Sequence, residues 1–348
     1  MPGDAAPPGG APAAPATAAP ARRAWRTALL VAGAVALLGL PLVVTDRYFQ
    51  HVLVLAGIWT LLAASFNLLC GYAGLLNLGH AAFFGVGAYA SALVAMHTGL
   101  SPWLTLAVGG LVASAFGVLL GIPSFRLRGP YLAIVTISFS EILRMVAMNW
   151  VDLTRGALGL YDIPPLTPIR LGGLTVEFVS ERSAYYVVLA LVVITVLLLR
   201  RLLHSDFGIT LESMREDEAG AESIGIHTTQ YKLAVFMISA FVAGFAGAFY
   251  AHYVRLISPE MMSAGETTSV ITMVMVGGLG TLMGPVLGGV LVTFLSEGLR
   301  FLKDVADLDL RLVIYGLALM LTILFMRDGV VGVGRALLRR RGAPGGAP

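Results

Sequence analysis

The sequence predicts an all-α fold, a polytopic bundle of about ten transmembrane helices, and three observations lead to this prediction. First, 57% of the 348 residues are hydrophobic and only 12% are charged, about half the charged fraction of a soluble domain. Second, long apolar runs recur along nearly the whole chain, and backbone in hydrocarbon must satisfy its hydrogen bonds internally, as a helix does. Third, a glycine-rich stretch in each half predicts one broken helix in each half.

The N-terminal region combines a low-complexity stretch with the first apolar run. Residues 1–21 are almost entirely Ala, Pro and Gly, and such a stretch buries too little apolar surface to offset its ordering entropy. Arg22, Arg23 and Arg26 then precede an apolar run over residues 27–45. This run is long for a signal peptide and no A-x-A-like site follows it, so we expect a retained first helix. The predicted divisions are a disordered cytoplasmic tail at 1–24, a transmembrane domain at 25–328 and a basic cytoplasmic tail at 329–348.

The apolar runs place ten spans along the chain. The eighth and ninth are separated only by glycine-rich sequence and could include a half-helix. With the N-terminus cytoplasmic, most of the 23 Lys and Arg residues fall in cytoplasmic segments, as the positive-inside rule requires. The C-terminus is then cytoplasmic too, and the longest external and internal connections are 151–183 and 201–230. The predicted spans lie near 27–45, 52–70, 75–96, 103–122, 131–150, 184–200, 231–253, 267–283, 285–299 and 311–327.

Two glycine-rich segments, 71–89 and 277–289, occupy corresponding positions in the two halves. Each segment follows a predicted span that runs from outside to inside, so the two halves form a parallel repeat. Broken helices of this kind line the pathways of many transporters. Close helix–helix packing explains the same glycines, and the two interpretations can coexist. His80 alone is more often a hydrogen-bonded structural residue than a ligand. The candidate pathway-lining residues are Gly74, Asn77, Gly79, His80, Gly277, Gly278 and Gly280.

Charged residues within the predicted spans form two pairs, Glu141 with Arg144 and Glu297 with Arg300. A spacing of three places both members on one helix face, where they can neutralise each other. Charge at membrane depth tends to face a bundle interior, so a relay or substrate contact is one interpretation. A structural ion pair near the external boundary is the interpretation that we favour for both.

The internal connection contains an acidic segment at 211–226 that predicts a short helix along the membrane surface. Met214, Glu218, Ala221 and Gly225 fall on one face of that helix, and Gly225 suits its C-terminus. Small residues on this face would allow docking against a partner, whereas a merely solvated helix explains the segment equally well. The residues alone leave these two interpretations open.

Several stretches resemble the permease subunits of bacterial branched-chain amino-acid ABC importers of the LivM type. The resemblance covers most of residues 50–325, and its order along the chain strengthens it. The segment 153–160 departs from the TGGPNGI-like run usual in that family, which leaves the substrate open among branched-chain amino acids, other amino acids, amides and urea. The matching stretches are GYAGLLNLGHAAFFGVGAYASAL (71–93), RGPYLAIVTISFSEILRMVAMNW (128–150), MREDEAGAESIGIHTTQYKLAVFMISAFVAGFAGAFYA (214–251) and VMVGGLGTLMGPVLGGVLV (274–292).

The resemblance implies a permease in the bacterial plasma (inner) membrane that imports branched-chain or related amino acids, powered by ATP hydrolysis on other subunits. The implied partners are a homologous second permease, two ABC ATP-binding subunits that hold ATP and Mg²⁺, and an extracytoplasmic substrate-binding protein touching loops 151–183 and 254–266. The segment 214–226 resembles the coupling helix that docks into a cleft of the ATPase. Its matching positions are Arg215, Glu216, Asp217, Glu218, Ala219, Ala221 and Gly225.

Other classes of function lack their motifs in this chain. No G-x-x-x-x-G-K-[ST], H-E-x-x-H or G-x-S-x-G occurs, so we expect no bound nucleotide, metal or other cofactor and no enzyme activity. The single cysteine, Cys70, excludes an intrachain disulfide framework. Nothing indicates a nucleic-acid partner. An ion-coupled secondary transporter is the main alternative, with Glu141 and Glu297 as its candidate ion-binding residues; a channel or a membrane enzyme ranks below it.

Overall fold

The computed structural model describes residues 37–124, 130–171, 174–176, 178, 180–306, 311–325 and 329–332. It divides the chain into two units, Met1–Thr45 and Asp46–Pro348. In the first unit residues 37–43 are helical, and most of the predicted span 27–45 lies outside the described residues. The predicted tails at 1–24 and 329–348 also lie outside them, apart from 329–332. The description below concerns the second unit.

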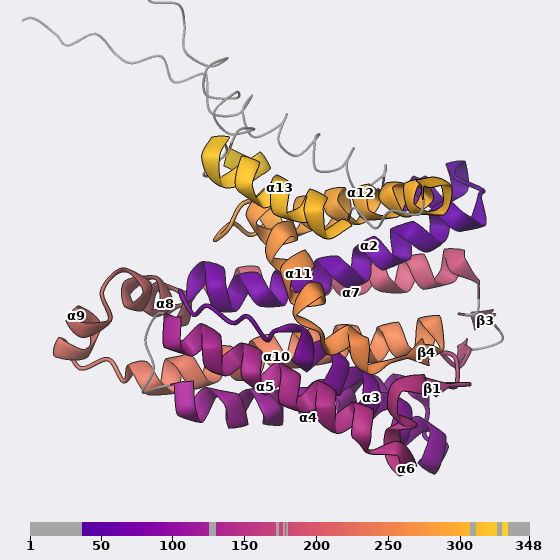
Figure 1. Cartoon of the computed structure of the whole chain (residues 1–348), viewed down its shortest axis with the longest axis horizontal. Coiled ribbons are helices and arrows are strands. Elements are labelled where there is room, and N and C mark those ends of the chain that lie inside the picture. Colours follow the sequence, from indigo (N-terminus) through magenta and orange to yellow (C-terminus); the bar gives the residue numbers. More distant parts are fainter. Residues whose placement is uncertain are drawn as a thin grey trace, which may run out of the picture. The chain divides into compact units, whose positions relative to one another are not determined.

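Six helices of this unit are long and apolar enough to cross a membrane, which takes about 20 apolar residues. Figure 1 shows long helices lying alongside one another. Helix α10 is central: it packs against α3, α4 and α2, and α2 in turn packs against α7. The six are α2 (Arg47–Phe66, continued by a π-helical turn over Asn67–Tyr72), α3 (Ala81–Thr98), α4 (Pro102–Ser124), α5 (Pro130–Asn149), α7 (Glu181–Leu203) and α10 (Thr228–Val254).

The prediction of ten spans is not confirmed, because among the described residues only six of the ten runs form helices that are both long and apolar enough to cross a membrane. The region 264–325 contains α11 (Ala264–Gly277), α12 (Gly284–Ala306) and α13 (Arg311–Phe325). Helix α11 has 14 residues, a length of about 21 Å against a hydrocarbon thickness of about 30 Å. It is therefore a half-helix, one of the possibilities that the glycine-rich sequence left open.

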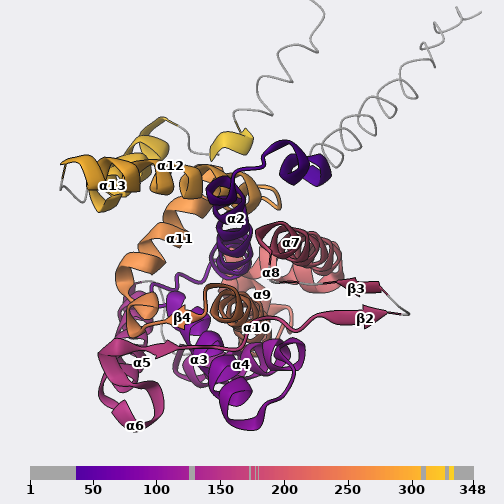
Figure 2. The same ribbon diagram turned by 90° about the vertical axis from the view of Figure 1, so that its right-hand side faces the viewer.

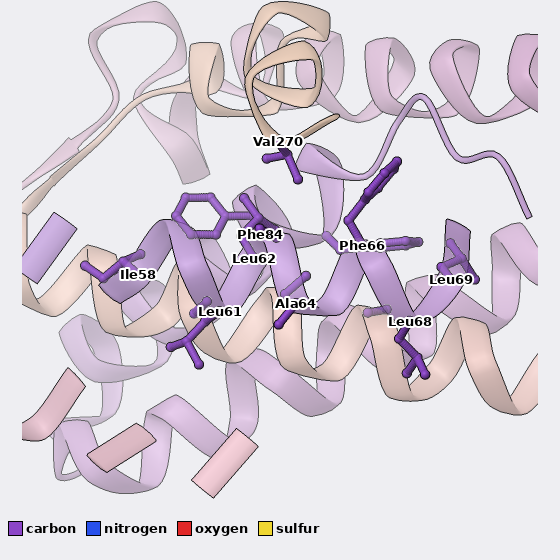
Figure 3. Close-up of a cluster of buried hydrophobic side chains, with 14 of the residues drawn as sticks. Ile58, Leu61, Leu62, Ala64, Phe66, Leu68, Leu69, Phe84 and Val270 are labelled. Carbon is purple, nitrogen blue, oxygen red and sulfur yellow. The ribbon is translucent and has the colours of Figure 1, made fainter. Parts of the chain in front are cut away.

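The core is built by small residues that bring helices together and by aromatic and aliphatic side chains between them. A Cβ added at Gly87 would lie 2.2 Å from the carbonyl oxygen of Gly244, and one added at Gly247 would lie 1.9 Å from that of Phe84. Helices α3 and α10 thus touch backbone to backbone, as small residues permit in membrane bundles. Figure 3 shows the neighbouring cluster, in which Leu62 of α2 lies beside Phe84 of α3, and Val270 of α11 belongs to the same cluster.

The two ends of the bundle carry different short elements (Figure 1). One end carries α8 (Asp206–Glu216) and α9 (Glu218–Ser223), which follow α7. At the other end, seen face-on in Figure 2, strand β1 pairs antiparallel with β4 and thereby joins the two loops predicted to be external. The elements there are α6 (Val151–Thr154), a 3₁₀ turn (Gly156–Leu158), β1 (Leu160–Tyr161), the hairpin of β2 (Ile169–Leu171) and β3 (Leu174–Val176), β4 (Leu256–Ile257) and a 3₁₀ turn (Pro259–Met262).

Candidate functional site

The acidic segment between α7 and α10 forms two helices, whereas the sequence predicted one helix over 211–226. The break lies at Asp217, whose backbone is extended with φ −149° and ψ 100°. Its carboxylate accepts a hydrogen bond from the Gly220 amide at 3.0 Å and so begins α9 as an N-cap. The residues predicted to share one face of a single helix therefore lie on two helices, Met214 on α8 and Ala221 on α9, and both of these side chains are buried.

Helix α9 is fixed to the start of α10 by its acidic side chains. Glu218 forms an ion pair with Lys232, whose side chain is nearly buried. Glu222 accepts a hydrogen bond from the Thr228 hydroxyl at 2.6 Å. Movement of α9 is therefore coupled to α10, and Lys232 is a partner that the sequence pattern did not reveal. Gly225 follows the end of α9, as expected.

Helix α8 contacts both glycine-rich segments through one side chain, Arg215. Its guanidinium donates a hydrogen bond to the carbonyl oxygen of Gly71. A Cβ at Gly74 would lie 3.0 Å from the Arg215 Cγ, and one at Gly280 would lie 3.1 Å from its Nη1. Both glycines have positive φ, +69° and +70°, a conformation that side-chain-bearing residues rarely adopt. The arginine therefore lies against both breaks in the helices.

The two glycine-rich segments are also hydrogen-bonded to each other. The Asn67 side chain donates to the Thr281 carbonyl oxygen at 3.0 Å and accepts from the Gly280 amide at 2.8 Å. A Cβ at Gly71 would lie 2.7 Å from the Gly280 nitrogen. Asn67 is not among the residues predicted from the sequence, although an amide at the end of an apolar helix, just before a glycine run, is a usable signal. The breaks in the two halves of the chain thus form one junction beside α8.

Asn77 and His80 lie inside the bundle and have no exposed surface. His80 pairs through Nε2 with the Ser65 hydroxyl at 2.8 Å, and its ring meets Phe66 and Phe83 edge-on. The side-chain oxygen Oδ1 of Asn77 accepts a hydrogen bond from the Gly79 backbone amide at 2.9 Å. These contacts fix the turn that leads into α3, which begins at Ala81 instead of near residue 75. A pathway-lining role for these residues stays a prediction.

Of the three remaining glycine candidates, Gly277 and Gly278 lie at the end of α11 and Gly79 lies just before α3. A Cβ at Gly277 would lie 1.9 Å from the Gly284 carbonyl oxygen, so the chain doubles back closely between α11 and α12. Gly278 is the C-cap of α11, and Gly79 packs against the backbone of Thr136 on α5. These positions are tightly packed, and their pathway-lining role also stays a prediction.

The charged side chains of α5 form a cluster of three groups. Arg144 binds both carboxylate oxygens of Glu141, at 2.6 and 3.0 Å, and binds Glu260 at 2.8 Å. This bidentate geometry is typical of strong Arg–carboxylate pairs. Glu260 comes from the turn before α11 and was not predicted. In the second predicted pair, Glu297 accepts a hydrogen bond from the Tyr48 hydroxyl at 3.2 Å, while the side chain of Arg300 lies outside the described part.

The six long apolar helices define the class of the chain, a multi-pass membrane protein. The family described as "Branched-chain amino acid transport system / permease component" matches residues 48–324. The chain belongs to this family.

Individual relatives agree with the family. The chain is 37% identical over 271 residues to the high-affinity branched-chain amino acid transport system permease protein LivM of Salmonella typhimurium and 36% identical to that of Escherichia coli K12. Both matches cover 73% of this chain and 64% of the relative, so less than two thirds of each relative's length is matched. The permease protein LivH of Salmonella typhimurium is 23% identical over 290 residues, covering 80% of this chain and 92% of LivH. No solved structure matches the chain.

Proposed function

We propose that this chain is a membrane-spanning permease subunit of an ABC importer that carries branched-chain or related amino acids into the cell. The observation that carries the proposal is the contact of α8 with both glycine-rich breaks through Arg215. Membership of the permease family and the identity with LivM support it. The chain supplies the pathway, and ATP hydrolysis on separate subunits supplies the energy.

The assembly that we propose contains a homologous second permease, two ABC ATP-binding subunits and an extracytoplasmic substrate-binding protein. The similarity of this chain to both LivM and LivH supports a pathway shared by two related permeases. ATP and Mg²⁺ bind to the ATPase subunits, and the permease itself holds no cofactor and is no enzyme. The subunit lies in the bacterial plasma membrane with both termini in the cytoplasm, the α8–α9 end inside and the β1–β4 end outside.

In this mechanism α8 and α9 transmit movement of the ATPase to the junction. Their outer surface offers Glu216, Ala219 and the 77% exposed Ile224 for docking, while Arg215 and Glu218 face the bundle. Displacing α8 shifts Arg215 against Gly71 and Gly280, which biases the pathway between outward-open and inward-open states.

The test is uptake of radiolabelled leucine by proteoliposomes that contain the complete transporter. Uptake should require ATP and the binding protein, and it should persist when ion gradients are collapsed. We expect Arg215→Ala to reduce uptake at least tenfold while ATP hydrolysis continues. Arg201→Ala, which changes an exposed arginine at the end of α7, is the matched control. Uptake that follows the proton gradient instead of ATP would favour the secondary-transporter alternative and contradict the proposal.

A further inference from the structure

Three polar side chains from three helices meet at the β1–β4 end of the bundle: His51 of α2, Glu181 of α7 and Tyr253 of α10. The Tyr253 hydroxyl donates a hydrogen bond to Oε2 of Glu181. Because a phenol has a single proton to donate, its oxygen accepts from Nδ1–H of His51, which lies 2.7 Å away. His51 and Glu181 are themselves 3.9 Å apart, measured from Nδ1 to Oε2. One hydroxyl thus joins the ends of three helices, and these three residues are called the external latch below.

The latch is positioned by ring stacking, whereas its hydrogen bonds are open to water. The rings of His51 and Tyr253 are stacked with their centroids 5.5 Å apart, and Tyr253 also stacks on Phe249, one turn earlier in α10. The side chains of His51 and Glu181 are 39% and 34% exposed. Water competes for hydrogen bonds of such groups, so their net strength is modest. The latch can therefore break and re-form while the rings keep its members close together.

Helix α7, which carries Glu181, is the least buried of the six long helices. Its buried residues are Ala184, Tyr185, Val188 and Leu199, and the first three lie within about two turns of Glu181. Helix α7 packs on α2, as Figure 2 shows, and among the described residues it has no extensive contact with α10. The hydroxyl of the latch therefore links α7 to a helix that it otherwise hardly touches.

The three helices of the latch are connected at their opposite ends to the elements that we propose to couple with the ATPase. Helix α7 leads directly into α8. Helix α10 is held to α9 by the ion pair of Lys232 with Glu218, and α2 ends beside Asn67, which bonds to the second glycine-rich segment. A displacement of α8 is therefore passed to α7, and the latch determines whether the outer end of α7 follows.

We propose that the external latch is a conformational device that holds the outer ends of α2, α7 and α10 together and releases α7 when the pathway opens to the outside. A hydrogen bond that is present in only one of two states shifts the equilibrium toward that state by its own net free energy. The intact latch therefore favours the arrangement in which the outer end is closed. This inference rests on the proposed function, which it deepens by locating the contact that keeps the pathway closed on that side.

The latch is tested by thiol labelling of the complete transporter in lipid nanodiscs, which leave both ends accessible, with Cys70→Ala removing the native thiol. Val188→Cys is the reporter, because Val188 is 1% exposed and lies against Gly57 of α2. Ala92→Cys is the matched reporter on α3, since Ala92 is buried about as far from the outer end of its helix but outside the latch. A charged methanethiosulfonate reaches such thiols only when the structure opens, so the labelling rate measures the open population.

We expect Tyr253→Phe, which keeps the ring and removes the hydroxyl, to speed the labelling of Val188→Cys about fivefold, the factor for one hydrogen bond of ordinary net strength. Labelling of Ala92→Cys should not change. Glu181→Gln keeps an acceptor oxygen and should label slowly, whereas Glu181→Ala should match Tyr253→Phe. Tyr131→Phe is the control variant, because it removes the hydroxyl of an exposed tyrosine on α5.

Three results would overturn the proposal. One is an unchanged labelling rate of Val188→Cys in Tyr253→Phe, which means that the hydroxyl does not hold α7. Another is equal acceleration at both reporters, which means that the whole bundle has loosened. The third is an unchanged amount of leucine imported per ATP hydrolysed by Tyr253→Phe, for which we expect a decrease of about twofold. Labelling needs no transport and wild-type uptake is measured separately, so failure of the latch is distinguished from failure of the proposed function.

Discussion

Arg215 is the residue on which the proposed coupling depends. Its side chain connects α8 to Gly71 in the first half of the chain and to Gly280 in the second. A guanidinium has five N–H donors in a rigid fork, so it can maintain several contacts at once. Lysine at this position would keep the charge but not this geometry, which is why Arg215 acts as more than a point charge.

At the same scale, Gly280→Ala should weaken the junction. The φ of +70° at Gly280 is strained for alanine, at a cost of about 1–2 kcal/mol, and the added Cβ would lie 3.1 Å from Arg215. We expect a lower thermal unfolding temperature and reduced ATP-dependent uptake. Gly298→Ala is the control, because nothing lies within 4 Å of its added Cβ and alanine favours a helix interior. Equal behaviour of the two variants would argue against the close contact.

At the scale of the element, the break between α8 and α9 shows what apolar periodicity cannot detect. The segment has strong helix formers on both sides of Asp217, so its pattern resembles one continuous helix. Asp is also a favoured N-cap, and the side chain here bonds to the Gly220 amide. The sequence therefore allows Asp217 to lie inside one continuous helix or to cap a second one, and the local pattern does not decide between the two. Because of the break, the orientation of α9 is set by its contacts with α10 and not by the axis of α8.

We expect Asp217→Ala to loosen α9 by about 1 kcal/mol, the usual contribution of an N-cap side chain. Hydrogen exchange of the amides in Glu218–Ser223 should become faster, while exchange in α10 should change little. Asp217→Asn can still accept the Gly220 hydrogen bond and is the control. Unchanged exchange in Asp217→Ala would mean that the cap is not what holds the start of α9.

At the scale of the whole molecule, the sequence predicted most of the membrane-spanning helices but few of the contacts between them. Long apolar runs identify a membrane helix directly, because hydrocarbon leaves backbone few other choices. The bonds of Asn67 to residues 280 and 281, and of Arg144 to Glu260, connect positions more than 100 residues apart. No local pattern encodes such pairs, which depend on the packing of α2, α5 and α11. The half-helix α11 was an open alternative because two glycines shortened an otherwise apolar run.

The pairing of β1 with β4 is another contact between residues far apart in the sequence, and it can be tested. Leu160 lies opposite Ile257 in the antiparallel pair, where Cα atoms are about 4.5–5.5 Å apart, within the range of a disulfide. In a Cys70→Ala background, Leu160→Cys with Ile257→Cys should form an intramolecular bond. Closing a loop of this size should raise stability by about 3–5 kcal/mol, seen as a higher unfolding temperature without reductant. The Leu160→Cys single variant is the control, and a failure to cross-link would contradict this register.

The two hydrogen bonds of Asn67 have a consequence for the balance between conformations. A buried hydrogen bond contributes about 1 kcal/mol net, so the two together hold the junction by about 2 kcal/mol. Such an energy favours the joined arrangement about thirtyfold and leaves the separated one at a few per cent of molecules. A partner would have to bind the separated arrangement about 900-fold more tightly, by about 4 kcal/mol, to reverse that ratio. The side-chain amide of Asn67 thus contributes to the balance between the joined and separated arrangements of the junction.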